Sequence, residues 1–180
     1  MSATTPDDTA LTLAAKGGDL DAFESLVRAH TPVVYAHALR FFGDTGAAED
    51  VVQEVWIKVY RALGAFDERS RFTTWLYRVT RNTCLDQLRA SKHRPIPVDV
   101  LDDPVVGDFA DEVALRAALE HAMRALPPDD RDALSAVALF DMTYAEAGAE
   151  LGIPAGTVKS RVFRARRALA HALAFPRGDA

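Results

Sequence analysis

Cationic side chains, a hydroxyl and one aromatic ring recur near the C-terminus at a helical spacing. At about 100° per residue, a helix there would bury an apolar stripe of Val158, Val162, Ala165 and Leu169. The opposite face would carry Lys159, Ser160, Phe163, Arg164 and Arg167. Cations bind phosphates and guanine edges, a hydroxyl bonds a base or a phosphate, and a ring can contact a thymine methyl group. Such a face is typical of a helix that reads the DNA major groove. A solvated basic face is the alternative, and it explains an exposed Phe163 least well.

The element that would position this face is a helix-turn-helix. Thr143 and Glu146 form a capping box that predicts a short helix through Leu151. Gly152, Ile153 and Pro154 then predict a turn, with Pro154 at the first position of the next helix. Two further helices are indicated upstream, one by Leu115, Leu119, Met123 and Leu126 and one by Leu134, Val137 and Phe140.

A second set of cations lies in the N-terminal half, among aromatic residues. A helix over about residues 71–92 would bury Phe72, Trp75, Leu76 and Val79 and expose Arg78, Arg81, Asn82, Arg89 and Lys92. Cations that hold phosphates beside rings that stack on bases are typical of single-stranded DNA binding. The rings in question are Phe66, Phe72, Trp75 and Tyr77. An aromatic stripe at helical spacing is more often core, so the rings alone are weak evidence.

An acidic patch lies just upstream of these cations. Residues 48–63 follow the i, i+3, i+4 spacing of an amphipathic helix. The polar side of its first two turns holds Glu49, Asp50, Gln53 and Glu54. Acids at that position complement the helix dipole, and a docking surface for a protein partner is the alternative.

The charge of the chain is segregated along its length. The 180 residues carry a net charge of −5, yet residues 51–94 hold nine basic and four acidic residues and residues 155–180 hold six and one. Residues 95–112 hold six acids, no base and three prolines (Pro95, Pro97 and Pro104), which predicts an extended linker. Two basic segments separated by an acidic one indicate two polyanion contacts. The expected architecture is all-α, with an N-terminal tail and helix start (1–19), a helical domain (20–94), the linker (95–112), a second helical domain (113–174) and a tail (175–180).

Several classes of protein are disfavoured. A single cysteine, Cys84, cannot form an internal disulfide or a Cys-rich zinc site, which favours the cytosol. The N-terminus lacks the pattern of a secretory leader, and there is no apolar run long enough to insert into a membrane. No glycine-rich phosphate loop, HExxH sequence or nucleophile elbow is present. We therefore expect no enzyme activity, no cofactor and no metal, and we expect His30 and His37 at the surface.

Four segments together resemble the extracytoplasmic function (ECF) group of bacterial sigma-70 factors. They are AEDVVQEVWIKVYRAL (48–63), FTTWLYRVTRNTCLDQLR (72–89), LPPDDRDAL (126–134) and TYAEAGAELGIPAGTVKSRVFRARRAL (143–169). The resemblance implies two helical domains, sigma regions 2 and 4, that direct RNA polymerase core to promoters and start transcription. A helix-turn-helix regulator that does not dock on polymerase is the alternative.

The resemblance also implies roles for individual residues. Docking on the β′ coiled coil of RNA polymerase falls to Glu49, Asp50, Gln53 and Glu54. Contacts with minus-10 DNA are assigned to the loop 66–71, which would capture a flipped base, and to the helix after it. The residues are Phe66, Ser70, Arg71, Trp75, Arg78, Asn82 and Arg89. Minus-35 DNA falls to Lys159, Ser160, Arg161, Phe163, Arg164 and Arg167.

Further partners follow from the same resemblance. They are the polymerase β flap, promoter DNA and an anti-sigma factor, which could hold a cytoplasmic chain at the membrane. The chain departs from the usual pattern at Ala147 and Gly148, where a larger aliphatic residue and Ala are common. We expect this helix to bury less, and Gly148 to cost about 1 kcal/mol relative to Ala.

Overall fold

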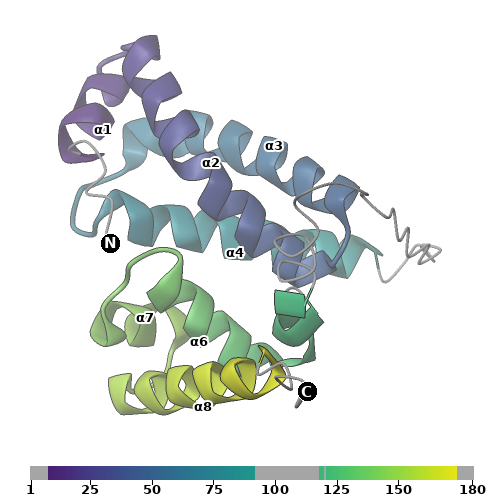
Figure 1. Cartoon of the computed structure of the whole chain (residues 1–180). Helices are drawn as coiled ribbons and strands as arrows, with labels where there is room; N and C mark the ends of the chain where they lie inside the picture. Colours follow the sequence, from purple (N-terminus) through teal and green to yellow (C-terminus); the bar gives the residue numbers. More distant parts are fainter. Residues whose placement is uncertain (1–7, 92–117, 120, 174–180) are drawn as a thin grey trace, which may run out of the picture.

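The chain folds into helices throughout the part that the structure describes. The computed structural model describes residues 8–91, 118–119 and 121–173 (Figure 1). Its elements are α1 (Asp8–Lys16), α2 (Leu20–Phe42), α3 (Thr45–Ala62), the 3₁₀ helix η1 (Leu63–Ala65), α4 (Phe72–Ser91), α6 (Pro128–Ala138), α7 (Tyr144–Leu151) and α8 (Ala155–Leu173). The predicted all-α class is confirmed. The predicted linker 95–112 and the tail 175–180 lie outside the described residues.

Helices α1 to α4 form an N-terminal bundle whose boundaries follow from local capping. The Asp19 carboxylate accepts hydrogen bonds from the backbone N–H groups of Asp21 and Ala22, which begins α2. Gly43 ends α2 in the left-handed conformation with φ 69°. Asp44 then caps α3 by accepting from Ala47 N at 2.6 Å. Two long helices therefore meet at a tight turn and pack side by side.

The core of the N-terminal bundle is built from the apolar stripes of these helices. Val51, Val55 and Val59 of α3 are fully buried, as the periodicity predicts. Leu26 of α2 and Leu76 of α4 are buried against them. Cys84 is buried too, and this burial raises the pKa of its thiol to about 12, in agreement with a packed rather than a reactive side chain.

Helices α6 to α8 form a C-terminal bundle that contains the predicted helix-turn-helix. The capping box between Thr143 and Glu146 is present, and Gly152 ends α7 at φ 68°. The carbonyl oxygen of Pro154 accepts from Thr157 N and Val158 N, so Pro154 is the N-cap of α8 and not its first helical residue. The predicted buried stripe of α8 is confirmed at Val158, Val162 and Ala165.

Gly148 permits the close packing of the turn, a role that the expected cost in helix propensity does not reveal. A Cβ atom there would lie 2.7 Å from the carbonyl oxygen of Ile153 and 3.3 Å from Ala155 N. The Gly148 carbonyl oxygen also accepts from Ile153 N at 3.0 Å. The backbone of the turn lies directly on α7, and glycine is the residue that leaves room for it.

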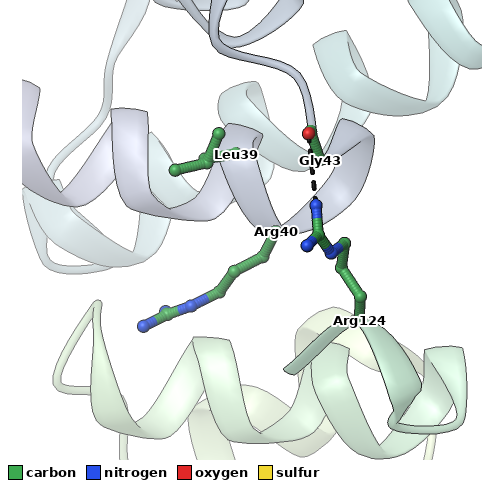
Figure 2. A pocket seen from close by; sticks show the side chains of 4 residues that line it. All are labelled: Leu39, Arg40, Gly43 and Arg124. Atoms are coloured by element: carbon green, nitrogen blue, oxygen red, sulfur yellow. Dashed lines mark hydrogen bonds between the residues drawn. The ribbon is translucent and has the colours of Figure 1, made fainter. Parts of the chain in front are cut away.

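The two bundles pack against each other, as Figure 1 shows with α2 and α4 above α6–α8. At the C-terminal end of α2, Arg131 Nη1 donates to the Arg40 carbonyl oxygen at 2.8 Å. Figure 2 shows a second bond close by, where Arg124 Nη1 reaches the Gly43 carbonyl oxygen at 3.3 Å beside a small hollow lined by Leu39 and Arg40. Arg131 of α6 and Arg124, which precedes α6, thus bond the carbonyl oxygens at the end of α2.

Two histidines lie in the interior, which corrects the expectation of surface groups. His30 is buried, and its Nε2 lies 3.0 Å from Asp8 Oδ1. His37 is almost fully buried, and neither ring nitrogen has a hydrogen-bond partner among the described residues. No helix in the described part of the chain is both long enough and apolar enough to span a membrane.

Candidate nucleic-acid and polymerase interfaces

The outer face of α8 presents the side chains predicted to read DNA. Phe163 is 67% exposed, and Lys159, Ser160 and Arg167 are exposed as well. The buried stripe on the opposite side fixes this orientation. The Ser160 hydroxyl donates to the Thr157 carbonyl oxygen at 2.9 Å, which leaves its lone pairs available to a DNA donor. The predicted combination of cations, a hydroxyl and a ring is therefore assembled on one surface.

Two further arginines of α8 are bonded within the same bundle. Arg164 makes a bidentate pair with the buried Asp130 of α6, with Nη2 to Oδ1 at 2.7 Å and Nε to Oδ2 at 3.1 Å. This hydrogen bonding raises the pKa of Arg164. Arg161 pairs with Asp129 at 2.7 Å. Because both acids lie in the first turn of α6, these pairs hold α8 against α6 and fix the angle of the reading face.

The acidic patch of α3 lies on the outside of the N-terminal bundle. Glu49, Asp50 and Gln53 are exposed, and Glu54 is 44% exposed with its carboxylate 3.5 Å from Lys58. Ile57, on the same face one turn after Gln53, is also exposed. Carboxylates beside an exposed aliphatic side chain are suited to a basic protein surface with some apolar character.

The aromatic residues before and within α4 are packed into the bundle. Phe66 is buried, with its ring 5.1 Å from that of Trp75 and 6.4 Å from that of Phe72. Trp75 and Ser70 are half-buried. Asn82 is exposed, and Arg89 is exposed beside Asp86 at 3.2 Å. The aromatic stripe is largely core, which was the more common outcome anticipated for such a pattern.

Arg71, directly before α4, and Arg78, on α4, are paired with carboxylates of the C-terminal bundle. Arg71 makes a bidentate pair with Glu146, with Nη2 to Oε2 at 3.0 Å, and also bonds the Asp141 carbonyl oxygen. Arg78 makes a bidentate pair with Glu150, with Nε to Oε2 at 2.8 Å. We call the surface where these pairs form the interdomain contact. It includes Arg71, Arg78, Arg81 and Tyr77 and their partners in the C-terminal bundle: Asp132, Phe140, Asp141, Glu146 and Glu150.

Titration of these groups reflects the pairing. The hydrogen bond to Glu150 raises the pKa of Arg78. Burial alone would raise the pKa of Glu146, but hydrogen bonds from Arg71 and Thr143 outweigh it and lower the pKa. Arg81 donates to Asp132 Oδ2 at 3.0 Å, yet burial dominates there and raises the pKa of Asp132.

Three rings form the apolar centre of the interdomain contact. Tyr77 of α4 and Phe140 of the C-terminal bundle are both buried, with ring centroids 5.1 Å apart. His37 of α2 meets Phe140 at 5.7 Å. Burial raises the pKa of Tyr77. Burial, followed by the charges of Arg40, Arg81 and Arg131, lowers the pKa of His37 to about 3, so its imidazole is neutral.

Sequence reasoning missed the partners of the cations. Helical periodicity identifies which arginines leave the core, but it does not reveal which acids lie opposite them. One signal was available in the sequence: residues 113–154 hold seven acidic and three basic residues, and Glu146 and Glu150 stand one helical turn apart among them. No group of three or more His, Cys, Asp or Glu in the described residues is arranged to hold a metal ion.

Comparison with known proteins also divides the chain into an N-terminal and a C-terminal part. Residues 26–94 match the family model of sigma-70 region 2, and residues 116–169 match that of sigma-70 region 4. The chain is 36% identical to RNA polymerase sigma-H factor of Pseudomonas aeruginosa over 87% of this chain and 88% of the relative. It is also 36% identical to ECF RNA polymerase sigma-E factor of Escherichia coli K12, over 84% and 86%.

Solved structures with a similar fold include a sigma factor. CnrH, solved in complex with the cytosolic domain of CnrY, matches with a TM-score of 0.65 and 27% identity over 92% of this chain and 96% of CnrH. The sigma factor RpoE of Bartonella quintana, solved with the anti-sigma factor NepR, matches with a TM-score of 0.63 and 27% identity over 86% and 98%. With two helical bundles in the order of regions 2 and 4, and relatives of this identity over nearly the whole length, the chain belongs to the ECF group of the sigma-70 family of RNA polymerase sigma factors.

Proposed function

We propose that the chain directs RNA polymerase core to promoters by reading a minus-35 element with α8 and capturing the minus-10 strand with region 2. The observation that carries the proposal is the outer face of α8, where an exposed ring lies among exposed cations. The preceding helix, α7, begins with a complete capping box. Lys159 and Arg167 contact phosphate or guanine, Ser160 bonds a base or phosphate, and Phe163 meets a base methyl group. Arg161 and Arg164 hold the helix at the angle needed for this.

Polymerase docking is assigned to the acidic face of α3. Glu49, Asp50, Gln53 and Glu54 meet the β′ coiled coil, and region 4 meets the β flap. Fixing both regions on polymerase places two weak DNA readers at high effective concentration along one promoter. A chain of net charge −5 then binds promoters well only as part of the holoenzyme.

Minus-10 DNA and the C-terminal bundle compete for the same guanidinium groups. Arg71 and Arg78 are engaged by Glu146 and Glu150, and a phosphate would need the same donors. Both arginine side chains are about half exposed, at 45% and 53%, and exposed ion pairs contribute about 0–1 kcal/mol each. Binding to polymerase therefore supplies enough free energy to separate the regions, after which Arg71, Arg78, Asn82 and Arg89 line the DNA path.

An anti-sigma factor is the partner proposed to keep the chain inactive. Support comes from RpoE, whose structure was solved with the anti-sigma factor NepR. Such a partner would bind a cytoplasmic chain, and if it were anchored in a membrane it would hold the chain there. No covalent step is required for any of these actions.

Transcription in vitro tests the proposed function. Core polymerase is incubated with the chain and a promoter library, and Glu54→Lys, with Glu24→Lys as a charge-matched control on α2, is run in parallel. We expect specific initiation with the wild-type chain and the control, and its loss with Glu54→Lys. A regulator that does not dock on polymerase would bind its DNA equally well with Glu54→Lys. Absence of initiation with active core would contradict the proposal.

A further inference from the structure

We propose that Lys16, at the end of α1, is a positioning residue that sets the shape of the loop between η1 and α4 for base capture. The inference rests on the proposed function, in which the loop 66–71 receives an unpaired minus-10 base. It adds a residue some fifty positions upstream of the loop, in a helix to which no DNA contact is assigned.

Lys16 bonds the loop through two different acceptors. Its Nζ donates to the Phe66 carbonyl oxygen at 2.6 Å and to Glu68 Oε1 at 2.8 Å. The same ammonium lies 6.0 Å from the centre of the Phe66 ring. The Lys16 side chain is only 22% exposed, so it lies mostly under the loop. Charge-assisted hydrogen bonds to a backbone and a side-chain acceptor fix both the path and the tilt of this segment.

The loop has a conformation that needs such support. Glu68 adopts φ 59°, a left-handed conformation that is unfavourable for a residue other than glycine. Asp67 Oδ1 accepts from Arg69 N at 3.2 Å, which closes a tight turn around it. Phe66 anchors the start of the loop in the core. The bond from Lys16 to Glu68 holds the residue that would otherwise relax first, and it neutralises a carboxylate beside the expected path of the DNA.

Lys16 is itself held in a fixed place. It is the last residue of α1, which closes with Gly17 N bonded to Leu13 O and with Gly18 at φ 96°. The next turn leads directly into the Asp19 cap of α2. Because these bonds fix Lys16 independently of the loop, loss of its side-chain contact would change the loop and leave the bundle in place.

The experiment measures the coupling between Lys16 and the captured base. Holoenzyme is assembled with wild-type chain, Lys16→Met or, as a control, Arg28→Met, whose exposed side chain pairs with Glu24 on α2. Each binds two fluorescent nontemplate-strand oligonucleotides from a promoter found by transcription in vitro. One oligonucleotide carries the captured base, and the other has an abasic site in its place.

A positioning role predicts a loss that depends on the base. Lys16→Met should bind the intact strand about tenfold more weakly and the abasic strand as the wild type does, because no base then reports the shape of the loop. Arg28→Met should match the wild type on both strands, and Lys16→Arg should recover part of the loss. Glu68→Gln, which leaves α1 unchanged, should give a loss of about threefold, again on the intact strand only.

The alternatives give different results. An equal loss on both strands would make Lys16 a phosphate contact or a general stabiliser, and no loss on either would make its contact with the loop irrelevant; both overturn the proposal. Wild-type holoenzyme that binds the two strands equally would instead contradict base capture by the loop, and with it the proposed function on which the inference rests.

Discussion

The two surfaces predicted to meet DNA differ in what occupies them. On α8, Lys159, Phe163 and Arg167 are exposed, and the ion pairs made by Arg161 and Arg164 lie within region 4. At the start of α4, Arg71 and Arg78 are engaged by carboxylates of region 4. The face of α8 proposed to read the minus-35 element is therefore exposed in the free chain, whereas two arginines of the surface proposed for minus-10 DNA are bonded to the other region. Promoter recognition would then begin at the minus-35 element and reach the minus-10 strand only after the regions separate.

Helix α7 links the two surfaces. Gly148 lets the turn pack closely enough to set α8, while Glu146 and Glu150, from the same helix, bond Arg71 and Arg78. One short helix thus orients the face of α8 proposed to read DNA and bonds two arginines of the other proposed DNA surface. Changes on its two sides should separate these roles.

The largest effect is expected from Gly148→Ala, which disturbs the packing of the turn that orients α8. A Cβ atom 2.7 Å from the Ile153 carbonyl oxygen forces the turn off α7 and should destabilise region 4 by about 3 kcal/mol. Both tryptophans, Trp56 and Trp75, lie in region 2. Thermal melts should therefore show earlier loss of helix by circular dichroism than of tryptophan fluorescence.

Gly156→Ala is the matched control for that change. A Cβ atom at Gly156 of α8 meets nothing within 4 Å, so alanine should stabilise the helix by up to about 1 kcal/mol. If Gly148→Ala melted at or above the wild-type temperature, the close packing of the turn would be refuted.

The next largest effect is expected from a double substitution that removes a carboxylate partner from each of Arg71 and Arg78. Asp141→Lys with Glu150→Lys turns two attractions toward Arg71 and Arg78 into repulsions. We expect the free chain to bind single-stranded minus-10 DNA about thirtyfold more tightly, roughly 2 kcal/mol, by fluorescence anisotropy. Asp21→Lys with Glu24→Lys adds the same charge on α2, and an equal gain there would reduce the effect to net charge.

A smaller effect is expected on the pH dependence of the free energy of unfolding, through His37 of region 2. The imidazole of His37 has a pKa near 3 in the folded chain, against an ordinary value of 6.5. Below pH 6.5 the unfolded chain binds a proton that the folded chain does not, so stability is lost as the pH falls. The free energy of unfolding, followed by tryptophan fluorescence in urea, should fall by about 1.4 kcal/mol between pH 7.5 and 5.5 through this group.

His37→Leu provides the reference for that measurement, because it removes the titrating ring from among Phe41, Tyr77 and Phe140. The difference in pH dependence between wild type and variant isolates His37 from all other groups. Identical pH profiles would show that the ring is hydrated and not buried at the contact.

The smallest effect is expected on the salt dependence of DNA binding, which distinguishes Lys159 from Arg164 on α8. Lys159→Ala should lower the salt slope of minus-35 duplex binding by holoenzyme by roughly 0.9, the value for one phosphate contact. Arg164→Ala should change the slope less, because its guanidinium is bonded to Asp130. A larger change for Arg164 than for Lys159 would reverse the roles assigned to them.

Prediction from sequence succeeded where the signal was local. The capping box at Thr143, the turn at Gly152 and the buried stripe of Val158 and Val162 depend on neighbouring residues, and all three are present. The roles of individual DNA-facing residues stay predictions. The packing of His37 against Phe140 could not be foreseen, since it joins residues far apart in sequence with no periodic pattern between them.

Gly148 illustrates the same limit at short range. Its helix propensity indicated a weakness, but the cost of a side chain depends on the Ile153 carbonyl oxygen, whose position is set by tertiary packing. Lys16 likewise has no feature in the sequence that would connect it to Phe66 and Glu68.

The distance between the two regions tests the central claim most directly. Spin labels at Arg28→Cys on α2 and Arg166→Cys on α8 report it by pulsed double electron–electron resonance, while Cys84 is buried and escapes labelling. We predict one narrow distance distribution for the free chain and a longer distance on binding core polymerase. A free chain that is already extended, or a distance unchanged in active holoenzyme, would contradict a covered minus-10 surface.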